Sequence, residues 1–503
     1  MLRPAGSSSS LRAGLKGATL VRRTFTIRYK TSHAPASSSC PRIAIIGAGP
    51  AGLTLGILLH KHRIPFTIFE YRSRPTEKSY AKPSGMLDLH PATGLAALEA
   101  CGLARAFRAR SVECSEAVVV ADKDGSVLWS MDSADDTQPE ISRHALTKLL
   151  LSRLPDECIK WEHQLASARA STGDTSDSCL LDHVFTLQFE GRSKSGDPSA
   201  SSEVEMIADL VVGADGAWSR TRSSLLDVHK PLDERGPMYS GAQMITLDIA
   251  DLARRRPSLS ALLGPGSFFA LGDGNVIIVQ RGAGGAARVY LTVSSPEDNS
   301  LNMMTQDVRN SSSSSDTLPL EVIKHMLLGT PTTTDATKRS WRNFSTWGES
   351  LKELISLALE DLAETEHADL DVRGLYMRPV NELAWPHRAG VTLLGDAAHL
   401  MTPFAGEGVN LALSDALDLA GAITRAWDAS ITTNNDDNHD DNDRRRAFKR
   451  ILDPLILESE KAMIAKAEES AIEAWENLQV FIGEDAAKKA AALYQGWYPR
   501  PAS

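Results

Sequence analysis

Residues 42–70, RIAIIGAGPAGLTLGILLHKHRIPFTIFE, constrain the fold more than any other stretch of the chain. A short, continuous apolar run is typical of a parallel strand that is buried on both faces, and longer apolar periodicity indicates a helix. The stretch contains, in order, an apolar run at 43–46, glycines with G-x-G-x-x-G spacing at Gly47, Gly49 and Gly52, an apolar helical pattern at 53–59, a second apolar run at 66–69, and Glu70. This order predicts a βαβ unit that binds a dinucleotide. The alternative is a glycine-rich turn in an unrelated α/β domain.

Each feature of such a dinucleotide-binding βαβ unit has a physical reason. One glycine permits the tight turn, one lets the backbone approach a pyrophosphate, and one lets the helix pack closely on the strand. The diphosphate would bind the amides at the helix N-terminus, where the partial charge is positive. Glu70 ends the second strand and can accept hydrogen bonds from both ribose hydroxyls of an adenine dinucleotide.

Composition excludes several other classes of protein. The chain has 503 residues, 42% of them hydrophobic, which is enough for one large core or two joined cores. No apolar run approaches the roughly 20 residues of a membrane-spanning helix, so we expect no transmembrane segment. A net charge of −10 argues against a nucleic-acid partner, because nucleic-acid surfaces of proteins are usually basic. The five cysteines are scattered without C-x-x-C spacing, so we expect reduced thiols and no metal site.

Residues 1–40 differ from the rest of the chain. They are basic and rich in serine and alanine, and the first acidic residue of the whole chain is Glu70. This composition is typical of an organelle transit peptide, above all a mitochondrial one. The alternatives are a disordered tail or a misassigned start codon. We therefore expect a mitochondrial or a cytoplasmic protein.

The remaining chain carries further elements around two more nucleotide-type motifs. A turn at 123–125 predicts a hairpin, the segment 139–154 predicts a helix with Arg143 in its first turn, and 239–293 is rich in β-type sequence. The second motif is GADG at 213–216, with Ser219 and Arg222 behind it. The third is GDAAHLMTPFAGEGVN at 395–410, which follows a strand pattern.

Together the three motifs resemble the group A (aromatic-hydroxylase type) FAD-dependent monooxygenases, over nearly all of residues 41–425. The words GMLDLH (85–90), PEISR (139–143) and GDAAHLMTPFAGEGVN are similar to those of the tetracycline-inactivating flavin monooxygenases. Those enzymes have a degraded second motif, whereas Asp215 and Gly216 are intact here. Thr246 and Arg288 do not reproduce their drug-contacting polar groups, so the resemblance carries the flavin chemistry and not the drug.

The resemblance implies a fold and a domain order. The fold class is α/β, with a Rossmann-like FAD-binding domain, an interleaved β-sheet substrate domain and a long C-terminal helix. The predicted parts are the N-terminal segment 1–40, the first part of the FAD-binding domain with its inserted hairpin at 41–235, the substrate-binding sheet at 236–370, the GD-motif part of the FAD-binding domain at 371–430, an acidic flexible loop at 431–446, and a helical region at 447–503.

The resemblance also implies which residues bind the cofactor. Glu70 would hold the adenosine ribose, Asp215 would serve both FAD and the reduced nicotinamide, and Asp396 would hold the ribityl chain. Arg143 would reach FAD, and Gly85 would allow a close backbone approach. Gly408 and Val409 would begin a helix whose N-terminus points at the flavin pyrimidine, where its dipole stabilises negative charge on reduced flavin.

The implied activity is oxygenation. FAD reduced by NAD(P)H would react with O2 to a flavin hydroperoxide, which hydroxylates or epoxidises an electron-rich aromatic or polyketide-like small molecule in secondary metabolism or detoxification. The cofactor performs the difficult step, so no side chain is assigned as catalytic. The alternatives are a flavin reductase or dehydrogenase of the same fold, a mitochondrial quinone-ring hydroxylase served by a ferredoxin, and a binding protein without activity.

Several residues have a structural alternative to a functional role. Asp396 can cap a helix, Asp215 can stabilise a turn, and Arg143 can form a surface salt bridge. His399 has the type of a catalytic base, but a structural role is expected. Asp88 and His90 shape the substrate side or satisfy local backbone groups. Trp218 is expected to pack rather than stack on a ligand. The Asn- and Asp-rich loop 434–443 lacks the order of a calcium loop and is expected to be a solvated linker.

Overall fold

A computed structural model describes most of the chain from Cys40 onward. The described residues are 40–80, 84–115, 117–132, 137–171, 183–191, 203–282, 285–296, 298, 320–329, 342–364, 370–432 and 441–497. All of them belong to one compact unit, residues 38–503. The predicted transit segment, most of the linkers at 191–202 and 434–443, the serine run at 311–315 and Trp341 lie outside the described residues.

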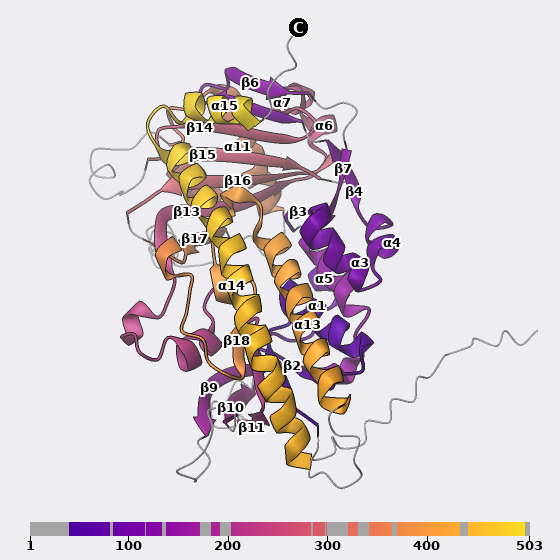
Figure 1. Ribbon diagram of the computed structural model, residues 1–503. Helices are drawn as coiled ribbons and strands as arrows, with labels where there is room; N and C mark the ends of the chain where they lie inside the picture. The colour runs from indigo at the N-terminus through magenta and orange to yellow at the C-terminus, as the bar shows by residue number, and fades with distance from the viewer. Residues whose placement is uncertain are drawn as a thin grey trace, which may run out of the picture. The chain divides into compact units, whose positions relative to one another are not determined.

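A five-stranded parallel sheet organises the nucleotide-binding part (Figure 1). Its strands, in spatial order, are β18 (Val391–Leu393), β12 (Leu210–Gly213), β1 (Ile43–Ile46), β2 (Thr67–Glu70) and β8 (Ile159–Trp161). The three neighbouring strands β1, β12 and β18 are each followed directly by one of the three motifs. Because the carboxyl ends of parallel strands meet at one edge, the sheet brings motifs from three distant parts of the chain together there.

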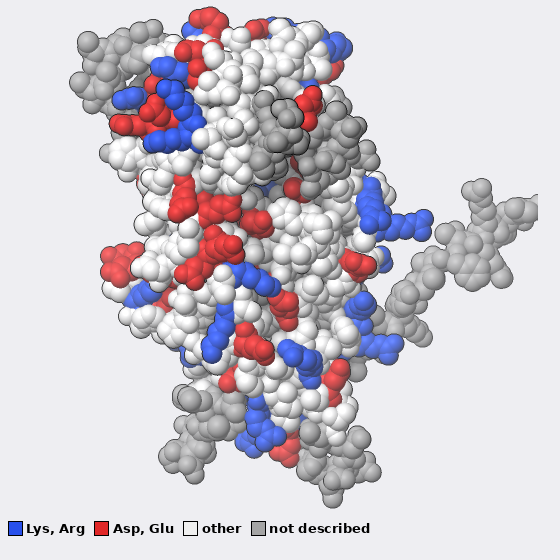
Figure 2. All heavy atoms as spheres, turned by 45° about the horizontal axis from the view of Figure 1, so that its top comes forward, with Lys and Arg blue, Asp and Glu red and all other residues white. Residues whose placement is uncertain are grey.

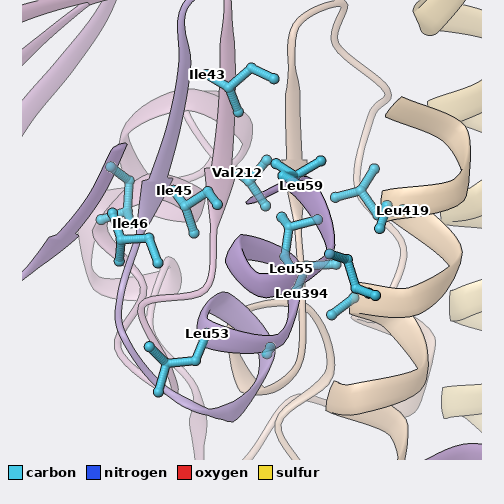
Figure 3. Packing of buried hydrophobic residues seen from close by; sticks show 14 of the residues in the cluster. Ile43, Ile45, Ile46, Leu53, Leu55, Leu59, Val212, Leu394 and Leu419 are labelled. Carbon is cyan, nitrogen blue, oxygen red and sulfur yellow. The ribbon is translucent and has the colours of Figure 1, made fainter. Parts of the chain in front are cut away.

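The apolar residues of these strands form one core with two helices. Helix α1 (Pro50–Lys61) starts right after the first motif, and α13 (Gly408–Thr432) starts at the end of the third. Figure 3 shows Leu55 and Leu59 of α1 close to Leu419 of α13. All three side chains are at most 1% exposed, so their burial stabilises the sheet and both motif-bearing helix starts together.

A seven-stranded sheet forms the second layer. Its order is β17 (Asp371–Met377), β13 (Met238–Ile249), β16 (Ala287–Ser294), β15 (Asn275–Arg281), β14 (Ser267–Gly272), β5 (Val118–Asp122) and β6 (Val127–Met131). The predicted hairpin is confirmed as β5 and β6, but it joins this sheet, because β5 pairs in parallel with β14. With β17 at the other edge, the sheet extends beyond the predicted range 236–370 on both sides. Helices α9 (Leu320–Leu328) and α11 (Glu349–Ala363) cover one face.

The remaining elements are two three-stranded sheets and short helices. They are the strands β3 (Met86–Asp88), β4 (Val112–Ser115), β7 (Thr137–Ser142), β9 (His163–Ser171), β10 (Val184–Gly191) and β11 (Glu203–Ala208), and the helices α2 (Glu77–Tyr80), α3 (Ala96–Ala100), α4 (Ala104–Arg108), α5 (Arg143–Leu151), α6 (Leu252–Arg255), α7 (Pro257–Leu263) and α12 (Asp396–His399). Arg143 lies in the first turn of α5, as predicted, but residues 139–142 of the predicted helix belong to β7, because Ser142 caps the helix there by accepting the N–H of Ala145.

The predicted final helical region is two helices, α14 (Asp441–Ile482) and α15 (Ala486–Trp497). The break follows from the backbone at 483–485, where Asp485 has a φ of +53°, a left-handed conformation that cannot continue a helix. Figure 1 shows α14 running beside α13, with α15 lying against the seven-stranded sheet. Within the described ranges, no helix is both long and apolar enough to cross a membrane.

Charged side chains of both signs cover the face shown in Figure 2. A group of acidic side chains lies near the middle of this face, and basic side chains lie below it as well as toward the sides.

Candidate cofactor and active site

The first motif has the geometry of a phosphate-binding turn. Gly47 has a φ of +107°, and a Cβ atom there would lie 2.2 Å from the carbonyl oxygen of Ala214 in the second motif. A Cβ at Gly52 would lie 2.1 Å from the carbonyl oxygen of Gly47. At Gly49, the residue before α1, a Cβ would meet no atom within 4 Å. Two glycines are therefore required by packing, and the third leaves open space at a helix N-terminus, as an approaching pyrophosphate needs.

Glu70 holds this turn to the end of β2. One carboxylate oxygen accepts the N–H of Ala48 at 2.7 Å, and the other accepts the N–H and the Nε of Arg72, both at 2.9 Å. Glu70 is 2% exposed. A carboxylate has about four acceptor sites, so a ribose hydroxyl can still donate to it. Arg72 was not predicted from the sequence, where the sole indication of its role is its place two residues after the strand.

Asp215 stabilises the loop of the second motif. Its Oδ1 accepts from the hydroxyl of Ser219 at 2.6 Å, and its Oδ2 accepts the N–H and the hydroxyl of Thr221 at 3.0 and 3.1 Å. Burial raises the pKa of Asp215, against the effect of these hydrogen bonds. The turn-stabilising role is thus present in the structure, and contact with FAD or the nicotinamide stays a prediction.

Trp218, three residues further on, is 61% exposed. Its ring meets the ring of Tyr376 edge to face, with 5.0 Å between the centroids. The expected packing role therefore involves only part of the indole.

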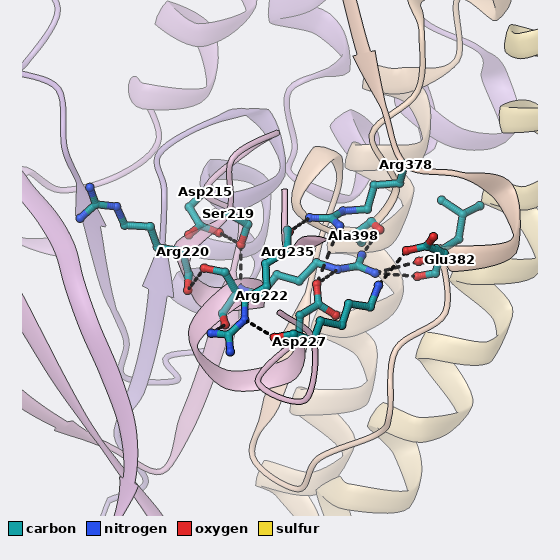
Figure 4. A network of polar contacts seen from close by, with 12 residues as sticks. Asp215, Ser219, Arg220, Arg222, Asp227, Arg235, Arg378, Glu382 and Ala398 are labelled. Atoms are coloured by element: carbon teal, nitrogen blue, oxygen red, sulfur yellow. Dashed lines mark hydrogen bonds and ion pairs between the residues drawn. The ribbon is translucent and has the colours of Figure 1, made fainter. Parts of the chain in front are cut away.

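Arg222 connects the second motif to the third (Figure 4). Its side chain is fully buried and donates from Nε to Asp227 at 3.1 Å, from Nη1 to the carbonyl of Ala398 at 2.6 Å, and from Nη2 to the carbonyl of Glu382 at 3.0 Å. Ala398 belongs to the GDAAH segment. The guanidinium therefore sets the position of one cofactor motif relative to the other.

Asp396 is the most open carboxylate of the third motif. Its side chain is exposed, although Gly395 and Ala397 on either side are buried. Enough protein surrounds it that desolvation raises its pKa, against the charges of His399 and Arg143. Among the described residues its carboxylate has no hydrogen-bond or ion-pair partner. A carboxylate in this setting suits a ligand rich in hydroxyl groups.

His399 has the structural role that was expected. Its Nε2 lies 2.7 Å from Asp415 of α13, and the same carboxylate oxygen accepts the N–H of Gly395 at 3.0 Å. Desolvation lowers the pKa of His399, but the Asp415 carboxylate outweighs it, so the pKa is raised. The pair holds the turn in front of Asp396 and is itself buried.

Arg143 and Gly85 meet at the boundary between the two layers. The N–H of Arg143 donates to the carbonyl of Gly85 at 3.0 Å. A Cβ at Gly85 would lie 2.7 Å from the hydroxyl of Tyr290 and 3.7 Å from Nε of Arg143. The Arg143 side chain is exposed and has no hydrogen-bond or ion-pair partner in the described part of the chain, so the alternative of a surface salt bridge is not seen there, and contact with FAD stays a prediction. Its charge acts on Asp396.

Tyr290 is a site residue that sequence analysis missed. It lies on β16, where the residues Val289 and Leu291 on either side of it are fully buried in the core under α11. Alternation along a strand therefore points Tyr290 to the opposite face, toward Gly85 and Arg143. This period-2 pattern was the available signal, but it does not say which layer lies opposite.

The third motif ends in a second open helix start. Helix α13 begins at Gly408, and a Cβ at Gly406 or at Gly408 would meet no atom within 4 Å. Val409 follows in the first turn, partly buried against the main core. The predicted role of Gly408 and Val409 toward the flavin stays a prediction, and the open space at this helix N-terminus fits it.

These features fit FAD. Two open helix starts lie at Gly49 and Gly408, and the charges of Asp396 and Arg143, whose side chains have no partner among the described residues, act on each other. In the described part of the chain, no three His, Cys, Asp or Glu side chains group as a metal site. Fold and site together define a flavin-dependent oxidoreductase with a separate sheet facing its cofactor region.

Comparison with known proteins identifies the family. Residues 41–231 and 289–488 match the family described as FAD binding domain, and the chain belongs to this family. Monooxygenase penA of Penicillium thymicola is 33% identical over 463 residues, which is 89% of this chain and 97% of that protein. Monooxygenase asqM of Emericella nidulans is 32% identical over 460 residues, 90% of this chain and 98% of that protein. The protein is an FAD-dependent monooxygenase of the group A, aromatic-hydroxylase type.

A solved structure shows the same fold. HpxO of Klebsiella pneumoniae, in complex with FAD and uric acid, matches with a TM-score of 0.58 and 16% identity over 91% of this chain and 92% of that one.

Proposed function

We propose that this enzyme uses NAD(P)H and O2 to hydroxylate or epoxidise an electron-rich aromatic or polyketide-like small molecule, in secondary metabolism or detoxification. The observation that carries the proposal is the meeting of Tyr290, from the seven-stranded sheet, with Gly85 and Arg143 of the cofactor side. It puts one face of the sheet against the predicted flavin position, where a substrate would have to lie. Two fungal relatives that are named monooxygenases support it.

The chemistry of that sheet face suits a largely neutral, flat molecule. Thr246, Tyr290 and Ile278 are cross-strand neighbours, so hydroxyl, aromatic and aliphatic groups lie side by side. Arg288, on the same face of β16, is paired with Asp248 at 3.0 Å, so its charge is neutralised. This sheet face therefore offers apolar contact and hydroxyl groups, and the charge of Arg288 is not free for an acidic substrate.

Bound FAD supplies the oxygen chemistry, and the chain supplies binding, orientation and electrostatics. The N-terminus of α13 and the guanidinium of Arg143 provide positive potential for a cofactor that becomes negative on reduction. The apolar part of the sheet face limits access of water. The hydroxyl of Tyr290 is half-buried and 3.3 Å from the amide oxygen of Gln280, so it can hold a polar group of the substrate in a defined orientation.

The test of function uses the purified full-length protein. We expect the absorption spectrum of bound oxidised flavin, slow NADPH oxidation in air, and faster NADPH oxidation with O2 uptake when phenolic or polycyclic candidates are added. A mass increase of one oxygen atom from isotopically labelled O2 would identify the product. NADPH oxidation that no candidate accelerates, with product formed without O2, would favour the reductase or dehydrogenase. Reduction by a ferredoxin but not by NADPH would favour the quinone-ring hydroxylase.

Tyr290→Phe tests the substrate side. We expect kcat/KM for an accepted substrate to fall about tenfold, because one buried hydrogen bond contributes about 1 kcal/mol and its loss leaves an unpaired partner. FAD content is expected to stay normal. Tyr239→Phe is the control, since the hydroxyl of Tyr239 donates to the backbone of Ser295 on the same sheet. Equal kcat/KM values for wild type and Tyr290→Phe would contradict this role.

The proposal for the compartment rests on the N-terminal composition alone. A basic, acid-free segment at 1–40 favours mitochondrial import, and a cytoplasmic location is the alternative. Import would agree with the quinone-ring alternative, whereas a cytoplasmic enzyme would agree with secondary metabolism.

A further inference from the structure

Two segments that lie far apart in the sequence are hydrogen-bonded to each other at the end of the third motif. Asn410, fully buried in the first turn of α13, accepts the N–H of His90 at 2.9 Å and donates to the carbonyl of Asp88 at 3.1 Å. His90 and Asn410 are 320 positions apart. The end of β3 is therefore attached to the first turn of α13.

The imidazole of His90 adds a second attachment. Its Nδ1 lies 3.0 Å from Oε1 of Glu407, and its Nε2 lies 3.4 Å from Oδ2 of Asp88. An imidazole can donate from both nitrogens only when it is protonated. The two carboxylates favour that form, since the hydrogen bonds to Asp88 and Glu407 raise the pKa of His90 to about 10. His90 is therefore a cation near neutral pH.

The backbone on both sides of Glu407 is glycine, which by itself does not fix the conformation of a loop. Glu407 stands between Gly406 and Gly408, and a Cβ at either glycine would meet nothing within 4 Å. Glycine backbone is flexible, so its conformation depends on anchors elsewhere. The loop is also anchored away from Glu407, because the carbonyl of Phe404 accepts from the side chain of Asn477 of α14 at 3.1 Å and the ring of Phe404 packs edge to face on that of Phe481.

We propose that His90 is a positioning residue for FAD: its bridge to Glu407 holds loop 403–408 in the conformation that receives the isoalloxazine ring. The proposal rests on the assignment of this loop to the flavin. Asp88 and His90, which sequence analysis left between a substrate role and a local one, then act on the cofactor through the loop.

The surrounding charges explain why a cation is needed. The charged or titratable groups that face the bridge are Asp88 on β3, Glu140 opposite Asp88 on β7, Glu407 in the loop, and Glu473 on α14, whose charge couples to that of Glu407. All four are acidic. If the imidazole loses its proton, the carboxylates on the two sides repel each other and Glu407 is no longer held to β3, whereas the two Asn410 bonds remain.

The direction of the pH effect follows from the raised pKa. The bridge is complete below the ordinary histidine pKa of about 6.5, persists through neutral pH, and is lost as the pH rises through about 10. FAD affinity is expected to follow this loss.

The experiment is a titration of the full-length apoprotein with FAD, followed by flavin fluorescence and visible circular dichroism, from neutral pH to above pH 10. For the wild type, we expect the Kd for FAD to rise about tenfold across that transition. For His90→Gln and for Glu407→Gln, we expect a Kd already about three- to tenfold higher at neutral pH, without a further step at high pH, because a charged, partly exposed hydrogen bond is lost. The double variant should resemble each single one, because both remove the same bridge.

Two controls separate this role from general stability. His387 is also held between two carboxylates, at 2.7 Å from Glu460 and 3.2 Å from Asp453, but it lies before β18 and does not contact the loop. His387→Gln is expected to lower the melting temperature while keeping the wild-type pH profile of FAD binding. Gly408→Val tests the loop assignment itself, and we expect it to abolish FAD binding.

The outcomes distinguish a failure of the positioning role of His90 from a failure of the assignment of loop 403–408 to the flavin. If Gly408→Val abolishes FAD binding but His90→Gln and Glu407→Gln bind FAD with the wild-type pH profile, the positioning role is wrong and the loop assignment stands. If Gly408→Val also binds FAD normally, the loop is not at the flavin, and both the assignment and the proposal fail. Should His90→Gln not fold, Glu407→Gln decides the question.

Discussion

Asp396→Ala is expected to yield a folded protein that has lost most of its FAD. The carboxylate is open, surrounded by protein and without a partner among the described residues, so the hydrogen bond it would make to a cofactor hydroxyl has no substitute. A hydrogen bond to a charged group contributes about 1.5–3 kcal/mol, which corresponds to an increase of roughly 10- to 150-fold in Kd. The ratio of flavin to protein absorbance and a titration of the apoprotein with FAD measure this.

The folded state should not depend on the same carboxylate. The melting temperature of apo Asp396→Ala is expected to match that of the wild-type apoprotein. Asp418→Ala is the matched control: Asp418 is exposed like Asp396, but it lies on α13 beyond the third motif and pairs with Lys466 at 3.0 Å. Normal flavin content and normal turnover in Asp396→Ala would refute the assignment of this residue to the cofactor.

Arg222→Met is expected to lower the free energy of unfolding by about 3–5 kcal/mol, because removing one partner of a buried ion pair leaves the other charge uncompensated. Asp227 would lose the guanidinium that lies 3.1 Å away and keep the more distant Arg378, which lies 3.8 Å from the same oxygen. The carbonyls of Ala398 and Glu382 would lose the hydrogen bonds that Arg222 donates. Urea unfolding of the full-length apoprotein, followed by circular dichroism, measures the change.

A neighbouring arginine provides the comparison. Arg220 is exposed and donates only to the backbone carbonyl of Leu165, so Arg220→Met should change the free energy of unfolding by less than about 1 kcal/mol. A second variant that combines Arg222→Met with Asp227→Leu should recover part of the loss, because the stranded charge is gone. Equal stability of Arg222→Met and Arg220→Met would show that the buried network does not link the two motifs energetically.

Local sequence was sufficient for the elements that carry the cofactor motifs. The strand at 43–46, the helix behind Gly49 and the strand that ends in Glu70 were all predictable, since apolar periodicity and glycine spacing act within about thirty residues. The hairpin around 123–125 was predictable for the same reason. The sequence did not predict that this hairpin joins the seven-stranded sheet, because that depends on the parallel pairing of β5 with β14, which is far away in the sequence.

By itself, the sequence determined a nucleotide-binding βαβ unit and the residue types of three motifs, whose resemblance to a known family implied FAD as cofactor. Only the tertiary structure decided which side chains meet across the layers: Tyr290 with Gly85, the imidazole of His90 with Glu407, and Arg222 with the carbonyl of Ala398. The reason is physical. Backbone conformation follows from neighbours along the chain, whereas a contact such as that of Arg222 and Ala398, 176 positions apart, depends on how complete layers pack together.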